Sequence, residues 1–158
     1  MRLHTVFSAV VLGFFFASAG SADTPVLTVR ADEIAQGVAE FDLSALDALP
    51  QQSFRTSTVW TDAEQEFSGP SLKAVLDSLG VSGATIHARA LNDYVIEIPY
   101  DSLEDGAPII TTRIDGAEFS RREKGPLWIM YPFDSDDRFQ TESTYGRSIW
   151  QLSELSVE

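Results

Sequence analysis

The sequence predicts a mixed α+β domain with a central β core and few short helices. Most periodic segments alternate apolar and polar residues as strands do, and one segment has the i, i+3, i+4, i+7 spacing of an amphipathic helix. The length of 158 residues and the 44% hydrophobic composition suit one globular domain. Because neither a repeat nor a Pro- or Gly-rich linker divides residues 23–158, we expect a single domain there.

The first elements are two strands with a helical turn between them. Residues 25–30 and 53–60 are rich in alternating β-formers and are predicted strands, the second running into a loop. Residues 44–49 predict a short helical turn, with Ser44 as its cap and Pro50 as its stop.

The clearest helix is predicted for residues 70–79. Pro70 suits the first helical position, and Gly80 suits the end. The apolar residues between them are spaced to bury one helix face: Leu72, Val75, Leu76 and Leu79.

The rest of the chain predicts strands joined by turns. Asn92-Asp93 predicts a hairpin between strands 85–91 and 94–98, because both side chains tolerate unusual backbone angles. Asp115-Gly116 predicts a second hairpin, with strand 109–114 and a return at 117–120. Two mostly apolar strands are expected after it, at 127–131 and 149–157.

Residues 1–22 have the pattern of a secretory signal. Arg2 precedes the apolar run 6–16, and small residues at 17–19 and 20–22 suit cleavage after Ala19 or Ala22. The alternative is an uncleaved membrane anchor. Loss of Arg2 changes the net charge from −13 to −14, so we expect a small acidic exported domain, periplasmic in a bacterium.

Composition excludes several classes of function. Without cysteine the chain has no disulfide, iron–sulfur cluster or thiolate ligand. His87 is the one histidine outside the signal, which is too few for a zinc site, and no Gly-x-Ser-x-Gly motif presents a serine nucleophile. The acidic charge disfavours nucleic acid, and the many paired carboxylates are interpreted as solvated loops.

Polar and aromatic residues gather where predicted strands meet loops, which is where scaffolds usually place binding sites. Aromatic walls with a few directed polar groups suit a flat heteroaromatic ligand, and Asp93 could accept two hydrogen bonds from an amino-pyrimidinone edge. The alternative is structural: Asn92-Asp93 as a turn, Trp60 and Trp150 as core, and the basic run 121–126, which includes Lys124, as a solvated loop. The candidate binding residues are Trp60, Asn92, Asp93, Tyr94, Lys124, Tyr131, Tyr145 and Arg147, and no catalytic or metal-ligating residue is predicted.

The order of several segments resembles the molybdopterin-binding domain of the sulfite oxidase family over about residues 50–158. The matching segments are Phe67-Ser68-Gly69-Pro70-Ser71-Leu72, Ala90-Leu91-Asn92-Asp93-Tyr94, Ile114-Asp115-Gly116, Lys124-Gly125-Pro126-Leu127-Trp128-Ile129-Met130-Tyr131-Pro132 and a closing strand at Trp150. The resemblance implies a sulfite-oxidase-type fold with a pocket for a pterin or a molybdopterin-like ligand.

The chain departs from that family at its metal ligand. Family enzymes bind molybdenum through a cysteine in the region that here is residues 54–61, which offers hydroxyl groups instead. The chain looks closer to exported members that lack this cysteine, some of which are similar to periplasmic pterin-binding regulators of a membrane-bound cyclic-diguanylate enzyme. We therefore expect a pterin-binding module without catalysis, whose partner is the periplasmic sensory portion of a membrane protein. The alternatives are a molybdopterin-dependent oxidoreductase and a structural adaptor without ligand.

Overall fold

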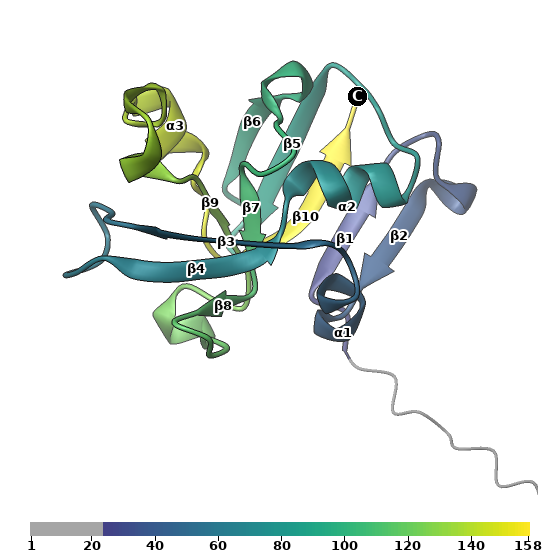
Figure 1. The fold of residues 1–158 in the computed structure, drawn as a ribbon. Coiled ribbons are helices and arrows are strands. Elements are labelled where there is room, and N and C mark those ends of the chain that lie inside the picture. Colours follow the sequence, from purple (N-terminus) through teal and green to yellow (C-terminus); the bar gives the residue numbers. More distant parts are fainter. Residues whose placement is uncertain (1–23) are drawn as a thin grey trace, which may run out of the picture.

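Strands dominate residues 24–158, which are the part of the chain that this computed structural model describes (Figure 1). The fold is a mixed α/β arrangement with a sheet-rich core and few helices, as the sequence predicts at that level. The predicted signal at residues 1–22 lies outside the described residues. Within them, no helix has the length and apolar character required to cross a bilayer.

The larger sheet has five strands in the order β2-β1-β10-β5-β6. β1 pairs with β10 in parallel, and every other neighbouring pair in this sheet is antiparallel. Apolar residues alternate along β1, where Leu27 and Val29 are buried. The strand bounds are Leu27–Arg30 (β1), Val38–Phe41 (β2), Thr85–Ala90 (β5), Val95–Pro99 (β6) and Leu152–Val157 (β10).

A second layer contains β3, β4 and β8 in one sheet and β7 and β9 in another. β7 runs beside β4, joined through a bridge between Ser71 and Ile109 and a 2.9 Å bond from the Thr112 amide to the Ser68 carbonyl. Gly69 allows this approach, since a Cβ there would lie 2.0 Å from the Ile110 carbonyl oxygen. The bounds are Gln51–Thr56 (β3), Gln65–Pro70 (β4), Ile109–Thr111 (β7), Arg113–Ile114 (β8) and Trp128–Met130 (β9).

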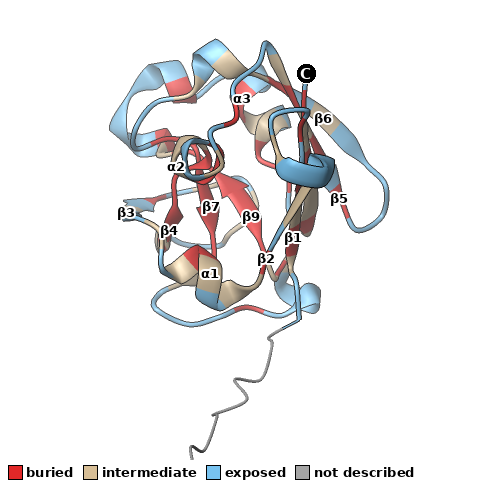
Figure 2. Cartoon of the chain, turned by 90° about the vertical axis from the view of Figure 1, so that its right-hand side faces the viewer, coloured by how far each residue is buried: buried red, intermediate tan, exposed pale blue. Residues whose placement is uncertain are grey.

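The core lies between the two layers, where buried residues line β1, β4, β7 and β9 (Figure 2). Helix α2 (Leu72–Ser78) packs one face into it and buries Leu72, Val75 and Leu76, as the apolar spacing predicts. The other helices are α1 (Leu43–Asp47) and α3 (Glu142–Arg147). Short 3-10 helices lie at Ala35–Gly37, Tyr100–Ser102, Arg121–Glu123, Phe133–Ser135 and Asp137–Phe139.

The predicted hairpin at Asn92-Asp93 is confirmed, but several predicted boundaries are wrong. Pro70 ends β4 instead of beginning α2, whose cap is the Ser71 hydroxyl accepting from the Ala74 amide. The predicted strand 53–60 stops at Thr56, and the chain then turns. The return at 117–120 is only a single bridge between Ile114 and Ala117, not a strand.

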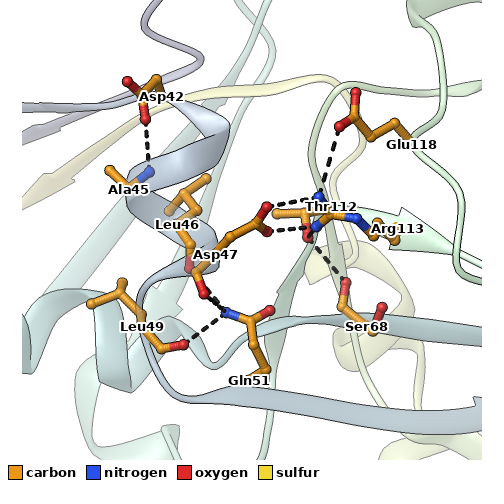
Figure 3. Close-up of polar contacts among 10 residues, drawn as sticks. All are labelled: Asp42, Ala45, Leu46, Asp47, Leu49, Gln51, Ser68, Thr112, Arg113 and Glu118. Carbon is orange, nitrogen blue, oxygen red and sulfur yellow. Dashed lines mark hydrogen bonds and ion pairs between the residues drawn. The ribbon is translucent and has the colours of Figure 1, made fainter. Parts of the chain in front are cut away.

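A pair of opposite charges joins α1 to the second layer (Figure 3). Arg113 on β8 donates two hydrogen bonds to the Asp47 carboxylate, at 2.5 and 2.7 Å. Asp42 caps α1 by accepting from the Ala45 amide at 2.7 Å, so the prediction that Ser44 is the cap is wrong. The bidentate geometry fixes α1 against the sheet.

Candidate functional site

A cavity of about 390 Å³ opens between three segments of the chain: the turn after β3, the tip of the β5–β6 hairpin, and the stretch from α3 to the start of β10. Its volume lies in the range of small-molecule sites. The lining residues are Trp60, Ala90, Asn92, Tyr94, Tyr145, Gly146, Ser148, Ile149 and Trp150. This cavity contains four of the eight predicted binding residues: Trp60, Asn92, Tyr94 and Tyr145.

Trp60 is the centre of an aromatic cluster at this cavity. Its ring lies 6.0 Å from the rings of Tyr145 and Trp150 and 5.7 Å from the ring of Trp128, all edge-on. It also lies 6.1 Å from Phe133. Edge-to-face pairs at these separations are favourable, so the cluster holds the indole in place from several sides.

Hydrogen bonds fix the turn that carries Trp60. The Thr58 and Thr61 hydroxyls lie 2.9 Å apart, and Thr58 Oγ1 also accepts from the Trp60 amide at 3.1 Å. The Ser57 amide donates to the Asp134 carboxylate at 2.6 Å, which attaches the turn to the loop after β9. Threonine and serine hydroxyls favour such local turns because they bond to nearby backbone amides.

The tip of the β5–β6 hairpin supplies Asn92 and Tyr94. Asn92 Oδ1 accepts from the Tyr94 amide at 3.2 Å, an Asx turn that leaves the two amide hydrogens of Asn92 free to donate. Asp93 occupies the left-handed region with φ of 65°, which aspartate tolerates better than most residues. This turn therefore orients one carboxamide and one phenol toward the cavity.

Helix α3 forms the opposite wall. Thr141 caps it by accepting from the Thr144 amide at 3.2 Å, and the Tyr145 ring stacks on Phe133 with centroids 4.6 Å apart. Ser148 Oγ donates to the Thr144 carbonyl at 3.0 Å, which closes the end of the helix. The wall is therefore anchored on the core.

No charged side chain is among the described residues that line the cavity. The lining residues supply as side-chain polar groups the Asn92 amide, the hydroxyls of Tyr94, Tyr145 and Ser148, and the indole N–H groups of Trp60 and Trp150. Aromatic faces with a few neutral hydrogen-bonding groups suit a flat, uncharged heteroaromatic ring better than an ion.

The structure places the other four predicted residues away from the lining of this cavity. The Asp93 side chain is 87% exposed, and its carboxylate lies 3.5 Å from Arg89. Lys124 borders a second cavity, and its ammonium lies 5.6 Å from the Trp128 ring centroid. Tyr131 and Arg147 lie near each other, Tyr131 buried and Arg147 half-buried.

Tyr131 is a buried phenol in an apolar setting. Its ring packs 6.0 Å from Phe139 and 6.4 Å from Phe133, and its hydroxyl has no hydrogen-bond partner among the described residues. Burial raises the pKa of Tyr131 to about 12, while the positive charge of Arg147 opposes this rise. Tyr131 therefore belongs to the packing behind α3.

Sequence reasoning missed Trp150, which lines the cavity with 39% of its surface exposed. Trp150 was not among the candidate binding residues, and the structural alternative assigned it to the core. Its backbone forms a bridge with Trp128, so β9 brings it beside the aromatic cluster. Ala90, Ser148 and Ile149 also line the cavity, and their residue types give no signal of binding.

Residues 54–61, which the resemblance would place at the metal ligand of the sulfite oxidase family, do not fit a thiolate-held molybdenum centre. Besides the paired hydroxyls of Thr58 and Thr61, Thr56 Oγ1 accepts from the Asp134 amide at 3.1 Å and bonds to the Ser57 carbonyl at 3.2 Å. These hard oxygen donors already have protein partners, and they do not replace a soft thiolate. Within residues 24–158, no cluster of three or more His, Cys, Asp or Glu side chains could hold a metal ion.

No family model matches the chain, and no curated protein matches it at the significance required.

Proposed function

We propose that this chain is a periplasmic module that binds a pterin and performs no reaction on it. The observation that supports the proposal best is the cavity of about 390 Å³ whose walls are the aromatic rings of Trp60, Tyr94, Tyr145 and Trp150. Four aromatic side chains from three separate segments converge there around neutral polar groups. The resemblance to molybdopterin-binding domains agrees with this choice of ligand.

In this proposal the ring system of the pterin stacks on an aromatic wall. Stacking on an aromatic side chain is worth about 1–3 kcal/mol for a nucleobase, which is similar to a pterin in size and polarity. Asn92 donates to an oxygen or ring nitrogen of the ligand through its amide hydrogens, while its own oxygen holds the turn. Asp93, which the sequence analysis assigned to the pyrimidine edge, has no part in this version.

The partner that we propose is the periplasmic sensory portion of a membrane-bound enzyme of cyclic-diguanylate metabolism. The exposed large hydrophobic side chains of the described residues lie on or beside the segments that form the cavity: Val59, Leu91, Tyr94, Val95 and Trp150. A partner that covers this rim would bury apolar surface and sense whether the cavity is filled. The charge of −14 expected for residues 23–158 favours a partner surface with basic residues.

Calorimetric titration tests whether the protein binds a pterin. The full chain is expressed with residues 1–22 so that it is exported before purification. Oxidised and tetrahydro forms of 6-hydroxymethylpterin are the probes, and guanosine controls for unspecific stacking. We expect one site per chain that prefers a pterin to guanosine. Absence of binding at millimolar pterin would overturn the proposal, and stoichiometric molybdenum in the purified protein would favour an oxidoreductase instead.

A pull-down from membranes tests the partner. We expect pterin to change the capture of one membrane protein at least about tenfold, because a ligand shifts an equilibrium only through its differential affinity for two states. Identical capture with and without pterin would overturn the proposed pterin-dependent partner and leave only pterin binding.

A further inference from the structure

A second, larger cavity shares Trp60 with the first. Its volume is about 630 Å³, and its walls include Phe119 and Trp128. It is more polar than the first cavity, since six charged side chains border it: Asp62, Asp115, Glu118, Arg122, Glu123 and Lys124. Of the described residues, Trp60 alone lines both cavities.

Trp60 stands between the two cavities. Its ring contacts Tyr145 and Trp150, which line the first cavity, and Trp128, which lines the second. The turn that carries it is closed by the Thr58–Thr61 hydroxyl pair and attached to Asp134. The indole is therefore held in place by rings that line both cavities.

We propose that Trp60 is a specificity-determining residue that keeps the first cavity short. This inference rests on the proposed function and defines its ligand class as pteridines with compact substituents. A long substituent that points toward the second cavity meets the indole. Removal of the indole joins the two cavities, and a tailed pteridine then extends into the space that Trp128 and Phe119 border.

The charges that border the second cavity provide an independent prediction about which tails it accepts. Four carboxylates border that cavity against two cations, and Asp115 already accepts from the Glu66 amide at 3.0 Å. Glu123 is likewise held by Ser120, and Glu118 lies 3.7 Å from Arg113. Asp62 is exposed, and no hydrogen bond or ion pair to another described residue occupies its carboxylate. A tail that enters this cavity meets a net negative environment, which favours an ammonium end over a carboxylate end.

The test measures the affinities of two pterins for the wild-type chain, Trp60→Ala, Trp60→Leu and Trp60→Phe. The compact probe is 6-hydroxymethylpterin, and the tailed probe carries an uncharged aminobenzamide group at C6. We expect the wild type and Trp60→Phe to bind the compact probe at least about tenfold more tightly than the tailed probe. This is the scale on which pockets reject added groups. The alanine and leucine variants should bind both probes with similar affinity.

Tailed probes that end in an ammonium or a carboxylate provide the second measurement. Trp60→Ala and Trp60→Leu should prefer the ammonium end at low salt, and the wild type should not distinguish the two ends. Trp150→Ala is the matched control, because it removes an indole from the first cavity without joining the two cavities. It should weaken both uncharged probes by the same factor.

Two results would overturn the role of Trp60: equal affinity of the wild type for compact and tailed probes, or variants at Trp60 that weaken both probes equally. Trp60→Leu keeps apolar volume at the centre of the cluster. It therefore replaces Trp60→Ala in the test if the alanine variant is not folded, as judged by the absence of cooperative unfolding. If the wild type binds no pterin at all, the proposed function fails, which is a different outcome.

Discussion

Replacement of Trp150 by alanine separates ligand binding from packing. The indole is 39% exposed and lines the cavity, while its ring also contacts Trp60 at 6.0 Å and Trp128 at 6.3 Å. Two aromatic contacts at about 0.5–1.5 kcal/mol each predict a loss of at least about 1–3 kcal/mol in the free energy of unfolding, to which the lost burial of the indole adds. Loss of stacking on the ligand predicts about 1–3 kcal/mol in binding, a rise in Kd of about 5- to 150-fold.

Calorimetric titration with 6-hydroxymethylpterin and urea unfolding measure the two effects on the same protein. Phe54→Ala is the control, because Phe54 is a half-buried aromatic residue whose ring lies 6.5 Å from Phe67 and which lines neither cavity. It should lower stability by about 1–2 kcal/mol and leave the pterin Kd unchanged.

The reasoning is refuted if Trp150→Ala loses stability while its Kd stays within about a factor of two of the wild type. That result would mean that Trp150 only packs against its aromatic neighbours. It would also remove one of the four aromatic walls on which the proposed pterin site depends.

Three further predictions follow from the same geometry. Asp93→Ala should leave the Kd for pterin within about a factor of two in calorimetry, because its carboxylate is 87% exposed outside the cavity; a larger rise would return Asp93 to the site. Asp47→Asn should cost about 1–3 kcal/mol in urea unfolding by breaking a half-buried bidentate pair, whereas Glu64→Gln, which breaks a fully solvated pair with Arg55, should leave the unfolding midpoint nearly unchanged. Burial raises the pKa of Tyr131 to about 12, against about 10 in the unfolded chain. The stability that this difference contributes is therefore fully present below about pH 10 and is lost as pH rises to about 12. Tyr131→Phe should lose less stability in that window and should match or exceed the wild type at pH 7, since no hydrogen bond within residues 24–158 satisfies the buried Tyr131 hydroxyl; equal losses in both proteins would contradict this.

The fold was predictable where a single local signal decides the structure. The apolar spacing of Leu72, Val75 and Leu76 predicts one buried helix face, and Asn92-Asp93 predicts a hairpin turn. The start of α2 was not predictable in this way, because Pro70 suits both a helix start and a strand end. Tertiary pairing decides between them, since Pro70 lies opposite Gln51 in the β3–β4 ladder.

β2 and β4 were missed for a related reason. β2 contains Glu40, and its alternation is weak, yet it pairs with β1 over all four of its residues. β4 lacks β-branched residues and contains Gly69, but that glycine is what allows the chain at Ile110 to approach. Each strand is stabilised by its neighbours more than by its own propensity, which a local pattern does not report.

The site shows how far residue type alone can go. Strand ends rich in aromatic residues indicated Trp60, Asn92, Tyr94 and Tyr145, and the structure places these four residues in the lining of one cavity, because loops beside strands are where a scaffold exposes side chains. Tyr131 has the same residue type and a similar position, yet it is 5% exposed and packs behind α3. Position along the chain does not distinguish an exposed ring from a buried one when both follow an apolar strand.

At the hairpin tip, neighbouring residues differ in whether they line the cavity. Asn92, Asp93 and Tyr94 are consecutive, and only the first and third line the cavity. The positive φ of Asp93 turns the chain between them, so the outer two side chains reach the cavity while the middle carboxylate lies in solvent beside Arg89. The charge of Asp93 favoured it as the residue that would bind the pyrimidine edge of a pterin. The turn instead places the neutral amide residue Asn92 in the lining of the cavity. In the proposed function, a cavity that no charged side chain of residues 24–158 lines binds its ligand through stacking and shape, and we propose that its selectivity depends on Trp60, the ring that limits its length.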